Sequence, residues 1–193
     1  MKKIISYITL IALFACGNSN DKNPLDFEDT NKSSEEKNSQ MDIKYVENDS
    51  LDFIIQNPKG WDYDLGYKEA DIVMYDDACD TCYFKSSITI VSYSVEEEAT
   101  LDKISEQNMN ELIELYLEFK LMEYSDLKLN GVPAQRVSYA ADVDKNQSIG
   151  GIIYLVKNKT ELYVISCLGG NKYGEFGKSV DFFDEICSTF KLK

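Results

Sequence analysis

Three β-rich runs near the carboxyl end constrain the fold of this chain more than any other feature. They cover residues 135–143, 149–156 and 162–168, and only residues 144–147 and 157–160 separate them. Parallel strands need crossover connections of a dozen or more residues, whereas connections this short make hairpins. The spacing therefore predicts an antiparallel meander.

Three segments further upstream also have the composition of strands. Residues 51–55 read Leu-Asp-Phe-Ile-Ile and precede a turn sequence, Asn57-Pro58-Lys59-Gly60. Residues 70–75 and 86–95 are rich in Ile, Val and Tyr, residues that favour a half-buried pleated surface. Together with the meander, these segments predict an antiparallel sheet of about six strands.

Two segments carry the three- and four-residue spacing of amphipathic helices. The longer one covers residues 101–122, with Thr100 as its N-cap and Asp102 in the first turn, where a negative charge suits the helix dipole. The second closes the chain, and its apolar face comprises Phe176, Val180, Phe183, Cys187 and Phe190. The fold class is therefore α+β, with helices flanking the sheet.

The first residues have the three zones of an export signal. Lys2 and Lys3 precede an apolar run over residues 4–14, which is shorter than the about 20 residues that a membrane-spanning helix needs. Residues 13–16, Leu-Phe-Ala-Cys, resemble a bacterial lipobox, although Phe14 departs from the usual small or polar residue. We expect cleavage after residue 15 and lipid attachment at Cys16, and ordinary secretion is the alternative.

Composition divides the remainder into a tether and one domain. Residues 16–42 are mostly Asn, Ser, Lys, Asp and Glu and predict a disordered acidic tether, whereas residues 43–193 are long enough to form one domain with a core. The net charge of −14 argues against binding to nucleic acid. We expect a monomer that contacts the membrane through its lipid and has an envelope protein as its partner.

Four segments, in this order and spacing, resemble the PsbP-like family. They are residues 53–61, 129–137 and 162–165, and the terminal stretch 183–192. The resemblance covers about residues 43–193 and implies an α/β/α sandwich, a fold that the family shares with a small Ran-binding protein of nuclear transport. It implies an accessory protein that docks on larger complexes rather than an enzyme.

The chain has no histidine, which removes Ser-His-Asp and Cys-His catalysis and most zinc or copper ligand sets. We therefore predict no catalytic residue, no metal site and no cofactor. Residues 142–153 begin like a calcium-binding loop, but Gln147 and Ile153 occupy the positions of the required Gly and Glu. A polar hairpin turn explains this segment better.

Four cysteines remain besides Cys16. Cys79 and Cys82 have the spacing of a redox motif, but acidic neighbours disfavour a thiolate, so outside the cytoplasm we expect a structural disulfide. Cys167 and Cys187 either bond to each other or remain buried thiols, because their separation cannot be read from the sequence. These two alternatives stay open.

Trp61 follows the turn at residues 57–60 and is a candidate docking or ligand residue, with packing at the edge of the core as the alternative. The leading hypothesis is a lipid-anchored, non-enzymatic accessory or binding domain of the bacterial cell envelope, at the outer membrane rather than the inner one where a cell has both. The alternative hypothesis is an envelope thiol-redox protein or other enzyme that uses Cys79 and Cys82.

Overall fold

The fold is described by a computed structural model, which places residues 44–76, 85–170 and 176–193. A seven-stranded sheet has the order β3-β4-β5-β9-β8-β7-β6, and every neighbouring pair in it is antiparallel. Its strands are β3 (Asp62–Leu65), β4 (Ile72–Tyr75), β5 (Ser87–Ser94), β6 (Glu118–Leu129), β7 (Val132–Asp144), β8 (Gln147–Asn158) and β9 (Glu161–Gly170).

The predicted meander forms β7, β8 and β9 and is confirmed. Residues Lys145 and Asn146 make the first turn, between the paired residues Asp144 and Gln147. The carboxylate of Asp144 accepts a hydrogen bond from the backbone N–H of Asn146 at 2.7 Å, which fits the polar hairpin turn expected there. At the next turn, Lys159 has a positive φ of 55°.

A second sheet has three strands, in the order β1-β2-β10. It contains β1 (Tyr45–Val46), β2 (Phe53–Gln56) and β10 (Lys191–Leu192). The strand predicted at residues 51–55 therefore exists as β2, but in this small sheet and not in the main one. The turn after it is also confirmed, because the backbone N–H of Trp61 donates to the carbonyl of Pro58 at 3.1 Å.

Helix α1 (Leu101–Leu115) begins where the sequence predicts. The Thr100 side chain accepts a hydrogen bond from the backbone N–H of Lys103, as an N-cap does. The predicted end at residue 122 is wrong, because the backbone turns extended at Tyr116 and residues 118–129 form β6. Pairing with β7 from one end of β6 to the other outweighs the helical spacing of the apolar residues in this segment.

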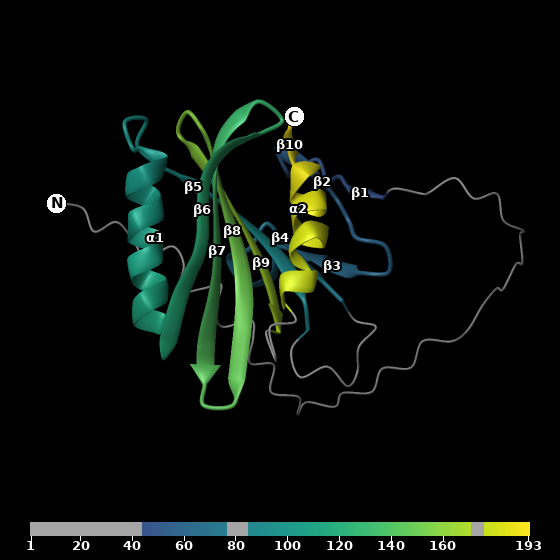
Figure 1. The fold of residues 1–193 in the computed structure, drawn as a ribbon. Helices are drawn as coiled ribbons and strands as arrows, with labels where there is room; N and C mark the ends of the chain where they lie inside the picture. Colours follow the sequence, from purple (N-terminus) through teal and green to yellow (C-terminus); the bar gives the residue numbers. More distant parts are fainter. Residues whose placement is uncertain (1–43, 77–84, 171–175) are drawn as a thin grey trace, which may run out of the picture.

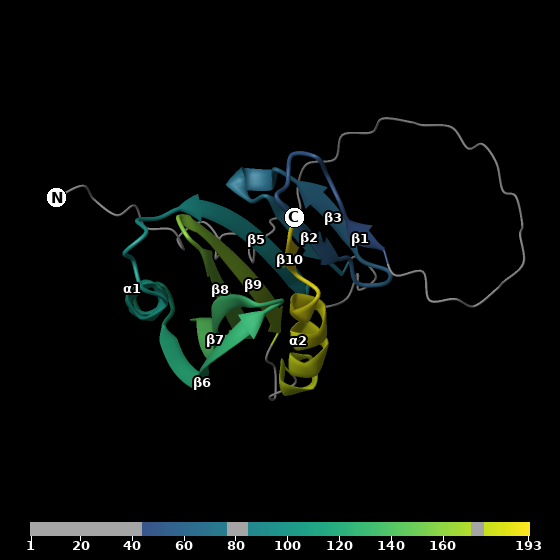
Figure 2. The ribbon, with the colours of Figure 1, turned by 90° about the horizontal axis from the view of Figure 1, so that it is seen from above.

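Helix α2 (Val180–Ser188) confirms the centre of the second predicted helix, with Phe183 and Cys187 buried on its apolar face. Phe176 and Phe190, which the prediction placed on the same face, are buried but lie outside the helix. Figure 2 shows α1 on one side of the large sheet, and α2 with the small sheet on the other. Each side has its own core, one under α1 and one under α2. This arrangement matches the predicted layering of helices around a sheet.

Two consecutive glycines in the middle of the sheet let aromatic rings approach the backbone from both sides. A Cβ added at Gly150 would lie 2.0 Å from Cγ of Phe176, and one at Gly151 would lie 2.3 Å from Cζ of Tyr139. Phe176 belongs to the core under α2, and Tyr139 belongs to the core under α1. At these two positions of β8, only a residue without a side chain leaves room for the ring that packs against it.

No helix in the described residues is both long enough and apolar enough to span a membrane.

Candidate docking edge

Strand β6 is an open edge of the large sheet. It extends over 12 residues, pairs with β7 on one side and is the last strand in the sheet order on the other (Figure 1). Its register with β7 shifts between Leu121 and Glu123, which places a bulge at Met122. An edge strand presents backbone N–H and C=O groups that another chain can pair with.

Large apolar side chains are exposed from the end of α1 into the edge strand β6. We use the term β6 margin for six of them, which follow one another from the end of α1 into β6: Ile113, Leu115, Leu117, Leu121, Met122 and Tyr124. Leu117 is 67% exposed and Met122 is 59% exposed. Single exposed apolar residues are ordinary, but six within twelve consecutive positions make this segment a candidate for an interaction surface.

The surroundings of the margin are acidic. Residues 101–129, which contain α1 and β6, carry seven carboxylates and three lysines. Glu118 on β6 lies directly opposite Asp142 on β7, and like charges in that position repel. Within the described residues, no Lys or Arg forms an ion pair with either carboxylate.

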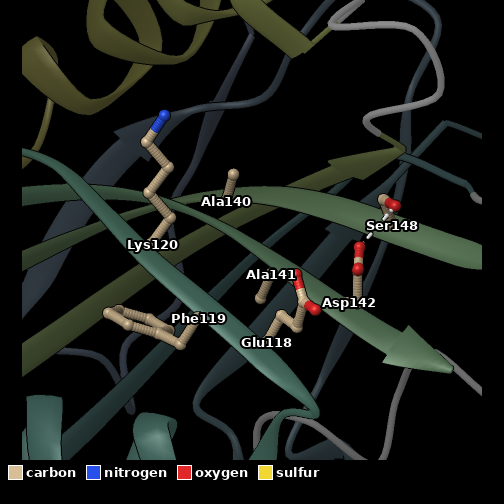
Figure 3. Close-up of a pocket in the computed structure, with 7 residues that line it drawn as sticks. All are labelled: Glu118, Phe119, Lys120, Ala140, Ala141, Asp142 and Ser148. Carbon is tan, nitrogen blue, oxygen red and sulfur yellow. Dashed lines mark hydrogen bonds between the residues drawn. The ribbon is translucent and has the colours of Figure 1, made fainter.

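A shallow hollow of about 240 Å³ lies beside these two carboxylates. It is lined by Glu118, Phe119, Lys120, Ala140, Ala141, Asp142 and Ser148. Figure 3 shows Lys120 extending away from Glu118 and Asp142, while Ser148 donates a hydrogen bond to Asp142 at 2.5 Å. The hollow is smaller than the pockets of about 300–1,000 Å³ that enclose small molecules, but it has room for a side chain of a docked protein.

A buried arginine fixes the adjoining part of β6. The guanidinium of Arg136 binds Asp184 of α2 with two nitrogens, at 3.0 and 3.1 Å, and Glu123 of β6 at 2.7 Å. The Tyr154 hydroxyl also donates to Asp184. Burial raises the pKa of Tyr154, and the hydrogen bond to Asp184 raises it further. This cluster links α2 to the residue that follows the bulge, and so holds the edge strand in place.

A second polar cluster fixes β6 to α1 from the other face of the sheet. The Gln135 amide donates to Asp102 at 2.5 Å and to Asp126 at 2.9 Å. The Tyr124 hydroxyl donates to Asp102 at 3.0 Å, and burial together with this bond raises the pKa of Tyr124 to about 12. With both faces of β6 fixed in this way, its open edge is preorganised for pairing.

Trp61 is partly buried and packs against the core under α2. Its ring centroid is 5.5 Å from that of Phe182 and 6.4 Å from that of Phe183. The side-chain amide of Asn57 donates to its carbonyl at 2.9 Å. These contacts are those of a residue at the edge of the core, and a docking role for Trp61 stays a prediction.

The structure brings one of the two cysteine pairs together. The sulfurs of Cys167 and Cys187 are 3.4 Å apart, in contact but not bonded, and neither residue is exposed. Of the two alternatives left open, this structure has the buried thiols. Cys16, Cys79 and Cys82 lie outside the described residues, as do the expected signal and tether, so the lipidation and first-disulfide predictions stay predictions.

Comparison with known proteins identifies the fold and the family. Residues 4–192 match the family described as PsbP-like protein. No curated protein matches the sequence. Among solved structures, CyanoP, the PsbP of the cyanobacterium Synechocystis sp. PCC 6803, is 12% identical with a TM-score of 0.60, over 78% of this chain and 92% of that chain.

Two further structures have the same fold. The Ran-binding protein Mog1p of Saccharomyces cerevisiae is 13% identical with a TM-score of 0.57, over 79% of this chain and 96% of its own. LpqN of Mycobacterium tuberculosis, described as involved in cell envelope biogenesis, is 12% identical with a TM-score of 0.56, over 73% and 83% of the two chains. Because the family match covers nearly the whole sequence, this chain belongs to the family of PsbP-like proteins.

Proposed function

We propose that this chain is a lipid-anchored, non-enzymatic accessory domain of the bacterial cell envelope. In this proposal it docks on a partner protein through the β6 margin, and the partner contributes an extended segment that carries Lys or Arg. The observation that carries the proposal is the open edge of β6 with its exposed apolar residues.

The negative charge around the β6 margin favours a partner segment with a positive charge. Glu118 and Asp142 occupy directly opposite positions on β6 and β7 without a cationic partner among the described residues, and a partner's cationic side chain there would relieve their repulsion. A second copy of this chain would instead bring an equally acidic segment to the same place. The distribution of charge therefore favours a basic segment of another protein over self-association.

The envelope location rests on separate support. The first sixteen residues have the pattern of a lipoprotein signal that ends at Cys16. LpqN, which shares the fold, is described as involved in cell envelope biogenesis. The absence of histidine from the sequence supports a role without catalysis.

A photoreactive amino acid at position 122, in intact cells, tests the docking surface. We expect illumination to produce one discrete crosslinked product with a different protein. Replacing both carboxylates, Glu118→Gln with Asp142→Asn, should lower its yield about fivefold, because the single exposed ion pair that the partner's cation makes here contributes up to about 1 kcal/mol in total. Gel electrophoresis and mass spectrometry measure both quantities.

The opposite edge of the sheet provides the matched control. Leu65 on β3 is 41% exposed, and a photoreactive residue there should not give the same product. Asp62→Asn on β3 should leave the yield at position 122 unchanged. A product of two copies of this chain, or a yield that ignores the charges of Glu118 and Asp142, would contradict the proposal.

Lipid attachment has its own test. Radiolabelled palmitate should enter the full chain in growing cells, and the Cys16→Ser variant should lose the label, because the thiol of Cys16 is the expected attachment point. The variant should also be lost from the membrane fraction, because without Cys16 the chain lacks the attachment point for the lipid chains that stable anchoring requires. Label that persists in Cys16→Ser would refute anchoring through this residue.

A further inference from the structure

Cys167 and Cys187 face each other from the most enclosed elements of the fold. Cys167 lies on β9 and pairs in register with Ile88 of β5 and Ile152 of β8, so strands flank it on both sides. Cys187 lies on the buried face of α2. The two sulfurs are 3.4 Å apart, and both residues are completely buried.

We propose that Cys167 and Cys187 form a disulfide that joins α2 to the centre of the large sheet in the exported protein. The inference rests on the proposed envelope location, because thiols stay reduced in most cytoplasms. A disulfide has a sulfur–sulfur distance of about 2.05 Å, so the two side chains have to converge by little more than an ångström. Because the sulfurs are already in contact, rotation about the side-chain torsions of the two cysteines can bring them to bonding distance.

A metal site does not explain the pair. Zinc held by cysteines needs further ligands, usually four in total. In the described part of the chain, no group of three or more His, Cys, Asp or Glu residues could hold a metal ion. In this structure the two thiols are in hydrogen-bond contact, and oxidation of that contact would give a disulfide without moving α2 away from the sheet.

The oxidation is a thiol–disulfide exchange. A thiolate of this pair attacks the disulfide of a thiol-oxidoreductase, and the second thiolate then displaces that protein from the mixed disulfide. The two cysteines lose two protons and two electrons and gain one sulfur–sulfur bond, while the oxidoreductase disulfide accepts the electrons and leaves as a dithiol.

Burial determines when this reaction takes place. Exchange needs a thiolate that the oxidant can reach. In the folded protein neither sulfur is exposed, and burial raises the pKa of the Cys167 thiol well above its ordinary value. The bond therefore forms before α2 packs on the sheet, and a chain that folds with free thiols afterwards resists oxidation.

Mass spectrometry of the full chain from growing cells tests the bond and its location together. Cells are quenched in acid, and free thiols are alkylated under denaturing conditions. Membrane and cytoplasmic fractions are then digested with trypsin, which cleaves after Lys172 and Lys178 between the two cysteines.

We expect the membrane fraction to contain the two peptides linked through Cys167 and Cys187. Alkylated Cys167 and Cys187 in that fraction would overturn the disulfide and leave the envelope location intact. A chain confined to the cytoplasm would overturn both.

Two comparisons make the assignment specific. Cys187→Ser should abolish the linked peptides, whereas Cys79→Ser should leave them unchanged, and an altered linkage in Cys79→Ser would refute the pairing. Purified full chain that has been folded in reductant should remain unlinked in oxidised glutathione until urea is added. Rapid linking without urea would refute formation before packing.

Discussion

Gly150→Ala is expected to lower the free energy of unfolding by about 3 kcal/mol, at the upper end for an overpacked core. The new Cβ would meet Cγ, Cδ1 and Cβ of Phe176 at 2.0, 2.2 and 2.6 Å. These atoms lie near the root of a buried side chain, so no simple rotation of the ring makes room. Urea unfolding followed by circular dichroism measures the loss.

Two other glycines provide a graded control. A Cβ at Gly169 would approach Cδ2 of the same ring at 3.2 Å, whereas one at Gly177 would meet nothing within 4 Å. The expected order of destabilisation is therefore Gly150→Ala, then Gly169→Ala, then Gly177→Ala with a change within about 0.5 kcal/mol. Equal losses at Gly150 and Gly177 would show that Phe176 does not pack as described.

Asp184→Ala is expected to cost about 3 kcal/mol, because it leaves a largely buried guanidinium without its bidentate partner. The Arg136 side chain is 9% exposed and would retain only Glu123, whose side chain is 61% exposed. The Tyr154 hydroxyl would lose its acceptor at the same time. Thermal and urea unfolding of purified variants measure the loss.

The adjacent exposed carboxylate and a double variant separate this effect from a general effect on α2. Glu185→Ala should change the stability by no more than about 0.5 kcal/mol. Arg136→Met combined with Asp184→Leu should recover part of the loss, because no guanidinium then stays buried without its partner, although the Tyr154 hydroxyl still lacks its acceptor. A double variant that loses as much as the sum of its parts would contradict this account of the cluster.

Local patterns predicted the elements whose signals lie within a few residues. The Thr100 cap, the meander and the turn before Trp61 are all confirmed, because capping, hairpin length and turn chemistry act over short distances. Strand β6 was missed, although Asn130 and Gly131 carried its signal. Both residues have positive φ, 47° and 89°, which suits a two-residue hairpin between β6 and β7.

The candidate docking edge could not be assembled from the sequence, since its parts meet only in the folded chain. Arg136 and Asp184 are 48 residues apart in the sequence, and no local pattern around either residue predicts that the two side chains form an ion pair. The facing of Glu118 and Asp142 depends on a register that a bulge shifts by one residue. The exposure of Leu117 depends on the helix ending before it.

The small sheet bears on how the domain withstands mechanical load. The described chain begins beside β1, on the far side of the molecule from β6 in both views (Figures 1 and 2). Strand β1 is joined to β2 by only two paired positions, and β10 is joined to β2 by two more. Tension applied to the N-terminal segment would therefore separate β1 from β2 first, because local unfolding begins where few hydrogen bonds have to break. The seven-stranded sheet, in which β1 has no place, would stay folded, and the proposed docking edge on β6 would keep its geometry.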